Sequence, residues 1–102
     1  MAVEVVSIME FAGDPDELVA RMQDTINPVA ERKAPEYGGV SSTICRTDNG
    51  IMVINMWDSK EGRHRMADDP EVREAIQQGG FPPPSAKGYD VIAHRVVQGA
   101  TV

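Results

Sequence analysis

The candidate strands carry apolar side chains on both faces, and this feature limits the fold most. In residues 3–11, 51–57 and 89–97, apolar side chains occupy odd and even positions alike, whereas a half-covered sheet alternates apolar with polar residues. Two helices can cover only one face of such a sheet. A second copy of the chain, related by a two-fold axis, is the simplest cover for the other face. The sequence therefore predicts a homodimer whose two sheets pack together.

The order of the expected elements is β-α-β-β-α-β, which matches the ferredoxin-like plan. The expected elements are a strand over 3–11, a helix over 15–33, strands over 40–47 and 51–57, a helix over 59–78 and a strand over 89–97. They predict an α+β fold with a four-stranded antiparallel sheet in the order 4-1-3-2 and both helices on one face. Residues 1–102 are expected to form a single domain, with 98–102 as a flexible tail.

Prolines and their neighbours mark where the helices are expected to start and break. Asp14 is expected to cap the first helix, and Asp69 to restart the second helix after a break, since each precedes a proline. Pro28 is expected to kink the first helix, or to restart it with Asn27 as a new cap. Residues 79–88 contain three consecutive prolines and therefore predict a stiff loop.

Charge and cysteine content exclude several classes of partner and site. Ten Lys and Arg against sixteen Asp and Glu give the 102 residues a net charge of −6 at pH 7. This charge repels phosphate backbones and anionic lipid heads, so we expect no nucleic-acid and no membrane partner. A single cysteine, Cys45, excludes an intrachain disulfide, and residues 1–6 lack the pattern of a signal peptide. Together these features predict a cytoplasmic protein.

Trp57 ends a candidate strand and is followed by Asp58 and by Ser59, which is placed to cap the next helix. This step resembles the Trp-[Asp/Glu]-Ser step of the antibiotic biosynthesis monooxygenase family. The resemblance covers residues 3–97 and is sharpest over 51–76. It implies a dimeric α+β barrel, in keeping with the expected order of the elements.

Quinone-forming members of this family oxidise phenolic, anthrone-type polyketides with O₂ and no cofactor, using a Trp, an Asn, an Arg and a Tyr. The resemblance implies that Asn55, Trp57 and Arg73 are the catalytic residues here. Asn55 and Trp57 would line the pocket, and Arg73 would stabilise the developing oxyanion. The chain departs from the family at two points, because Asn55 lies two residues before Trp57 rather than four and Arg63 stands at the Tyr position.

Haem-degrading members of the family require a Trp and a haem-ligating His on the second helix, together with an Asn on the first strand. The corresponding positions of this chain hold Met66, Ile76 and Ser7. The resemblance therefore excludes haem degradation, and we expect no cofactor.

Three further residues, His64, His94 and Met66, are candidates for the substrate pocket. Histidine is a natural acid or base because its ordinary pKa lies near neutrality. Structural interpretations stand beside these roles: a solvated His64 on the second helix, a His94 at the dimer interface, and methionine that fills gaps in the core. The two histidines lie thirty residues apart without further ligands nearby, so we expect no metal site.

The three implied catalytic residues also have structural interpretations. Trp57 is a large core residue at a strand end, and Asn55 satisfies backbone groups near that end. In the same reading Arg73 is a surface partner of Asp69 or Glu74.

Taken with the resemblance, these residues favour a cofactor-independent monooxygenase-like protein that oxidises a small aromatic or polyketide-like metabolite with O₂. One alternative is a cofactorless cyclase or isomerase, in which Arg73 stabilises an enolate and O₂ plays no part. Another is a non-catalytic ligand-binding or stress-response barrel. The sequence leaves open whether the protein is an enzyme.

Overall fold

Four antiparallel strands form one sheet in the computed structural model, which describes residues 2–97. The strands are β1 (Val5–Ala12), β2 (Gly39–Arg46), β3 (Gly50–Trp57) and β4 (Ser85–Asp90). Their order across the sheet is β2-β3-β1-β4, which confirms the ferredoxin-like α+β fold. The tail expected over 98–102 lies outside the described residues.

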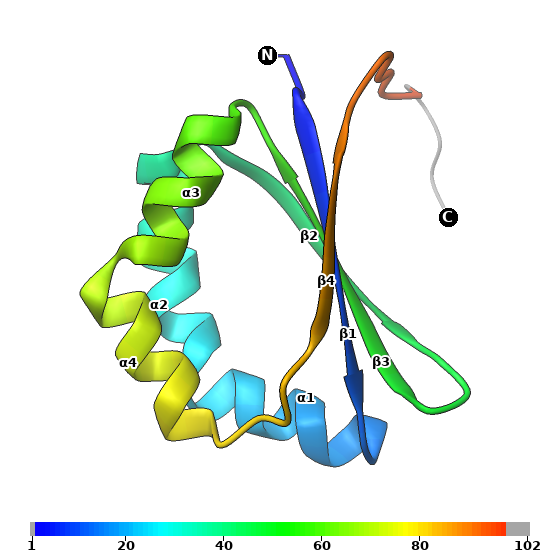
Figure 1. The fold of residues 1–102 in the computed structure, drawn as a ribbon, viewed down its shortest axis with the longest axis vertical. Helices are drawn as coiled ribbons and strands as arrows, with labels where there is room; N and C mark the ends of the chain where they lie inside the picture. Colours follow the sequence, from blue (N-terminus) through cyan, green and yellow to red (C-terminus); the bar gives the residue numbers. More distant parts are fainter. Residues whose placement is uncertain (1, 98–102) are drawn as a thin grey trace.

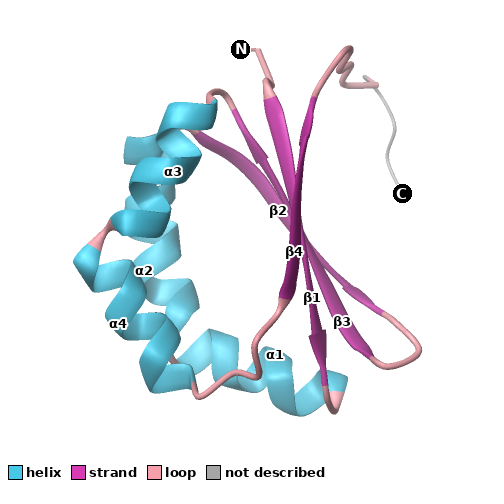
Figure 2. Cartoon of the chain, viewed as in Figure 1, coloured by secondary structure: helices cyan, strands magenta, loops and turns pink. Residues whose placement is uncertain are grey.

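The helices all lie on one face of the sheet (Figures 1 and 2). They are α1 (Pro15–Asp24), α2 (Ile26–Lys33), α3 (Lys60–Asp68) and α4 (Pro70–Gly79), with a 3₁₀ helix, η1 (Ala34–Tyr37), after α2. Each of the two expected helices is therefore divided into a pair. None of the helices in this part of the chain has the length and apolar character needed to cross a bilayer.

The two helix breaks have different causes. The second occurs at Asp69, as expected, because its carboxylate accepts hydrogen bonds from two backbone N–H groups in the first turn of α4. The first occurs at Thr25, so the break expected at Asn27 and Pro28 is wrong. The Thr25 hydroxyl donates to the Arg21 carbonyl oxygen at 2.7 Å. Pro28 instead falls in the first turn of α2, where its missing N–H costs no helical hydrogen bond.

The core lies between the helices and the sheet, on the side of the odd-numbered residues of β1 and β3. Its first cluster joins these strands to α1, and its second joins them to α3 and α4. The members of the first are Phe11, Leu18, Met22, Ile51 and Val53, and those of the second are Val5, Trp57, Met66 and Val72. Burying the helix-facing side of the sheet in this way sets the register of both strands.

The strand expected over 89–97 is wrong for most of its length. The observed strand β4 ends at Asp90, and residues 91–97 form no strand. Asp90 lies opposite Val5, the first residue of β1, and just beyond this pair the Val91 N–H donates to the Glu4 carbonyl oxygen at 2.8 Å. Part of the loop expected over 79–88 pairs with β1 instead, because β1 has a free edge at that point.

The opposite face of the sheet carries no helix (Figure 1). Apolar side chains at even positions of β1 and β3 gather there and are half-buried in the single chain. They are Val6, Ile8, Met52, Ile54 and Met56, which we call the open-face cluster. This face is the second apolar side that the strand patterns predict.

Candidate functional site

A row of three residues crosses the helix-facing side of the sheet at its centre. Ser7 in β1 lies opposite Asn55 in β3 and opposite Gly88 in β4. We call Gly88, Ser7 and Asn55 the Ser7 row. Ser7 is only 4% exposed, and its odd-numbered neighbours on β1 and β3 are apolar. The row therefore places polar groups inside an otherwise apolar layer.

Trp57 is tied to this row by a buried hydrogen bond. Its indole Nε1 donates to the Ser7 hydroxyl at 3.2 Å, which satisfies both polar groups in the core. The indole packs with Val5, Met66 and Val72. Trp57 and Met66 are therefore core residues beside the row.

Asn55 lies on the other side of Ser7 from Gly88 and is half-buried. Within residues 2–97 its side-chain amide makes no hydrogen bond, while the Ser7 hydroxyl is engaged by Trp57. An amide carries two N–H donors and an acceptor oxygen. Asn55 is thus the member of the row whose polar groups are available to a ligand.

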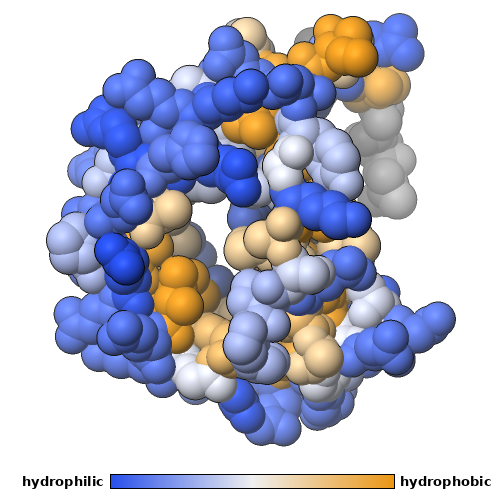
Figure 3. All heavy atoms as spheres, viewed as in Figure 1, coloured by the Kyte–Doolittle hydropathy of each residue, from blue (hydrophilic) through white to orange (hydrophobic). Residues whose placement is uncertain are grey.

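A cleft opens between α3 and β4 beside the Gly88 end of the row. It has a volume of about 360 Å³, and we call it the α3–β4 cleft. Its lining residues are Val5, Lys60, Arg63, His64, Gly88, Tyr89 and Asp90. Every residue of β4 is exposed, and Figure 3 shows the hollow between the helices and this edge of the sheet. The helix layer therefore leaves this edge of the sheet accessible.

Arg63 is the half-buried cation of the cleft. Its guanidinium lies against Gly88, where an added Cβ would stand 2.6 Å from Nη1. Lys60, on the preceding turn, pairs with Asp90 at 2.6 Å. Glycine at position 88 thus leaves room for the Arg63 guanidinium against β4, and a Cβ there would make the guanidinium shift.

The remaining expected site residues are dispersed. His64 lines the α3–β4 cleft and is exposed on α3. His94 is exposed in the segment beyond β4, so its expected place within a strand is wrong. Arg73 is exposed on α4 and is not among the residues that line the cleft. The structure thus brings Asn55 and Trp57 to the Ser7 row and leaves Arg73 and His94 apart from it.

Sequence reasoning missed Ser7, Arg63 and Gly88 as parts of one site. Ser7 had a signal, since it is the one polar residue among the odd-numbered positions of residues 3–11. Arg63 had one in the resemblance, which places it at the Tyr position of the quinone-forming members. Gly88 had none, because it lies in a strand that the sequence does not predict at that position.

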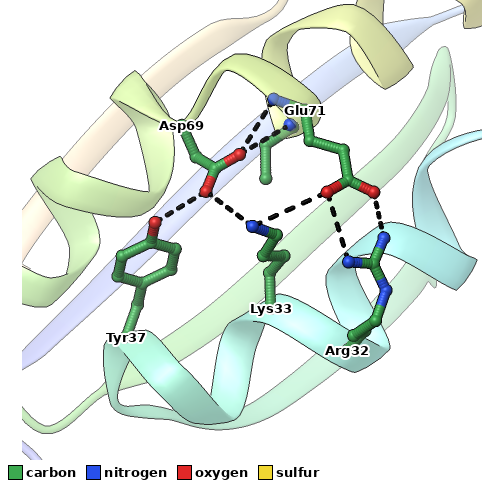
Figure 4. A network of polar contacts seen from close by, with 6 residues as sticks. Arg32, Lys33, Tyr37, Asp69 and Glu71 are labelled. Carbon is green, nitrogen blue, oxygen red and sulfur yellow. Dashed lines mark hydrogen bonds and ion pairs between the residues drawn. The ribbon is translucent and has the colours of Figure 1, made fainter.

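A second polar network lies among the helices and binds α2 and η1 to α4 (Figure 4). Asp69 accepts from the Tyr37 hydroxyl at 2.6 Å and from Lys33 at 3.2 Å, and Glu71 pairs with Arg32. The hydrogen bond from Tyr37, followed by those from Lys33 and the first turn of α4, lowers the pKa of Asp69 from 3.8 to about 2. Asp69 is therefore engaged within the helix layer.

Arg73 takes no part in this network. Within residues 2–97 it forms no ion pair with Asp69 or Glu74, the surface partners that its sequence position suggests. The same part of the chain contains no group of three or more His, Cys, Asp or Glu side chains placed to hold a metal ion.

No family model matches this sequence, and no curated protein matches it. Solved structures do match the fold. A putative antibiotic biosynthesis monooxygenase from Deinococcus radiodurans superposes with a TM-score of 0.67 at 17% identity, over 93% of this chain and 99% of that one. This chain has the fold of the antibiotic biosynthesis monooxygenases.

Two further structures share this fold. SnoaB, a cofactor-independent oxygenase from Streptomyces nogalater, matches with a TM-score of 0.60 at 19% identity, over 95% of this chain and 99% of that one. A dimeric ferredoxin-like protein from an uncultured marine organism matches with a TM-score of 0.68 at 12% identity, over 96% of this chain and 95% of that one. At these identities the likeness extends to the fold alone.

Proposed function

We propose that this protein is a cofactor-independent monooxygenase that oxidises a small aromatic or polyketide-type metabolite. The observation that carries the proposal is the Ser7 row, where the free amide of Asn55 lies beside the indole of Trp57 in an apolar layer. An accessible cleft leads to the other end of the row. The fold is also that of SnoaB, a cofactor-independent oxygenase.

Such a reaction needs a substrate that supplies the electrons itself. A deprotonated phenol gives one electron to O₂, and the resulting radical and superoxide combine at a ring carbon. With a proton this forms a ring hydroperoxide. Cleavage of its O–O bond releases water, made of the distal oxygen, its hydrogen and the proton from the ring carbon, and leaves a quinone. The sum is a phenol plus O₂ giving a quinone plus water, and the protein supplies orientation, dryness and stabilisation of the anion.

In this proposal Asn55 donates a hydrogen bond to a substrate oxygen, and Trp57 forms an apolar wall held in place by Ser7. Met66, packed against the indole, completes that wall. His64 lines the cleft through which the substrate enters. The family resemblance implies that Arg73 stabilises the oxyanion, and Arg73 is exposed on α4.

The alternative activity is that of a cofactorless cyclase or isomerase on a similar metabolite. The observation that favours it is that the available amide of Asn55 can stabilise an enolate as well as a phenolate. Oxygen consumption distinguishes the two activities, since a cyclase or isomerase leaves O₂ untouched. If no phenol is turned over by either activity, the remaining function is that of a non-catalytic ligand-binding barrel.

The experiment is measurement of O₂ uptake with 1,8-dihydroxyanthrone and a panel of naphthols, using metal-free protein. Wild type is expected to consume one O₂ per quinone formed. Asn55→Ala is expected to lower kcat/KM about tenfold or more, since it removes one donor to the anion. Gln23→Ala, a control on the exposed side of α1, should behave as wild type. Uptake that is equal with and without protein would refute the proposal.

We further propose that two copies form a homodimer through the open-face cluster. Five half-buried apolar side chains on one uncovered face of a sheet form a patch of the kind that marks an interaction surface. One neighbour with this fold is a dimeric protein.

Cys45 is free and exposed, which fits the reducing conditions of the cytoplasm.

A further inference from the structure

We propose that Arg63 binds an anionic oxygen of the substrate, so that the site selects aromatic metabolites in their deprotonated form. This inference rests on the proposed function, because it places the substrate along the Ser7 row. It assigns the binding of the anion to α3 instead of α4.

The first argument is the position of the Arg63 side chain. Arg63 lies on α3, yet its guanidinium reaches across the cleft to the backbone of β4 at Gly88. A Cβ at that position would stand 2.6 Å from Nη1 and 3.3 Å from Cζ. A side chain at position 88 would displace the guanidinium, so glycine there leaves room for Arg63 at the end of the Ser7 row.

The second argument is the balance of charge in the α3–β4 cleft. Apart from Tyr89, the lining residues that carry a charge or can take one up are Lys60, Arg63, His64 and Asp90. Lys60 and Asp90 pair with each other at 2.6 Å. In the described part of the chain no carboxylate lies within ion-pair distance of Arg63, whereas six other such pairs form. The Arg63 charge is therefore available to a ligand.

The third argument is distance along the row. Gly88 and Asn55 lie on either side of Ser7, and two strand spacings separate them by roughly 10 Å. A fused polycyclic aromatic can span this length. The cleft reaches the row at Gly88, so an oxygen of such a ligand would meet Arg63 there. Contact with Asn55 would require the ligand to pass Ser7, which is 4% exposed.

An arginine at this place has a chemical consequence. A guanidinium presents fixed N–H donors to an anionic oxygen, so it favours the phenolate over the phenol. The phenolate is the form that gives an electron to O₂. Binding at Arg63 would thus select the substrate and prepare it for oxidation.

The experiment measures how strongly the protein favours the anion of 4-nitro-1-naphthol, whose anion absorbs visible light. The apparent pKa of the bound naphthol is read from its absorbance in wild type and in Arg63→Gln, Gly88→Ala and Arg65→Gln. Arg65 is the matched control, since it is exposed on the same helix and lies over the Tyr37 ring. Thermal melting of each variant confirms folding.

Wild type is expected to lower the apparent pKa of the bound naphthol by about one unit, a tenfold preference for the anion. Arg63→Gln should remove this shift, Gly88→Ala should reduce it by displacing the guanidinium, and Arg65→Gln should retain it. The inference is overturned if Arg63→Gln keeps the shift, if Arg65→Gln loses it equally, or if wild type does not bind the probe. A shift that depends on Arg63, with no O₂ uptake from any phenol, would refute the oxygenase proposal and leave the anion site standing.

Discussion

The indole Nε1 of Trp57 donates a buried hydrogen bond of 3.2 Å to the hydroxyl of Ser7, across the pairing of β1 with β3. Ser7 is 4% and Trp57 7% exposed, so water cannot replace either partner. Ser7→Ala should therefore lower the free energy of unfolding by about 1–3 kcal/mol, because it leaves the indole N–H unpaired. Chemical denaturation measures this loss, and Ser41→Ala, on the exposed edge strand β2, should change stability by less than about 0.5 kcal/mol.

A double-mutant cycle separates this hydrogen bond from packing. In a Trp57→Phe background the Ser7 hydroxyl has already lost its donor. Ser7→Ala should then cost much less than in wild type. An equal cost in both backgrounds would show that the bond contributes nothing.

Asp69 should make stability depend on pH in the acid range. Its pKa is about 2 in the folded chain and 3.8 ordinarily, so the folded state favours the ionised form. The resulting stability is complete above about pH 4 and is lost as the pH falls through about 2. Asp69→Asn retains a helix cap but not the charge, so it should lower Tm by about 5 °C at neutral pH.

The difference in Tm between wild type and Asp69→Asn should shrink as the pH falls from about 4 to about 2. Asp68→Asn removes an exposed carboxylate from the neighbouring position and serves as the control. A difference for Asp69→Asn that stays constant down to pH 2 would contradict the assignment to this carboxyl.

Ile54, at the middle of the open-face cluster, should control assembly. Ile54→Asp places a carboxylate on that face in each copy, and burying two such charges against each other is unfavourable. Light scattering coupled to size exclusion should give twice 11.1 kDa for wild type and 11.1 kDa for the variant. Ala20→Asp, on the exposed side of α1, should remain a dimer. A monomeric wild type would rule out the proposed interface.

Arg63 and Arg73 can be compared directly by their effect on O₂ uptake with an electron-rich phenol. If Arg63 binds the anion, Arg63→Gln should lower kcat/KM roughly a hundredfold, and more than Arg73→Gln does. Arg65→Gln should match wild type. If O₂ uptake is lost only in Arg73→Gln, Arg73 and not Arg63 binds the anion, as the family resemblance implies.

Local signals in the sequence account for most of the fold. Asp14, Ser59 and Asp69 each cap a helix where expected, because a capping side chain bonds to backbone only two or three residues away. The apolar runs of β1 and β3 predict two buried central strands. Successive side chains of a strand point to opposite faces of the sheet, so an apolar run places apolar groups on both faces. The sequence leaves open whether Trp57 is a core residue or a site residue, and in the structure it packs in the core beside the row.

What the sequence by itself determined, then, is the order of the elements, their caps and the two-sided apolar sheet. Only the tertiary structure decided where β4 lies, because its residues Ser85–Asp90 are exposed and lack an apolar pattern. They form a strand because the edge of β1 is free to pair with them. The contact of Arg63 with Gly88 follows from that pairing. The contact depends on the distance between α3 and the edge strand β4, and no local sequence pattern encodes that distance.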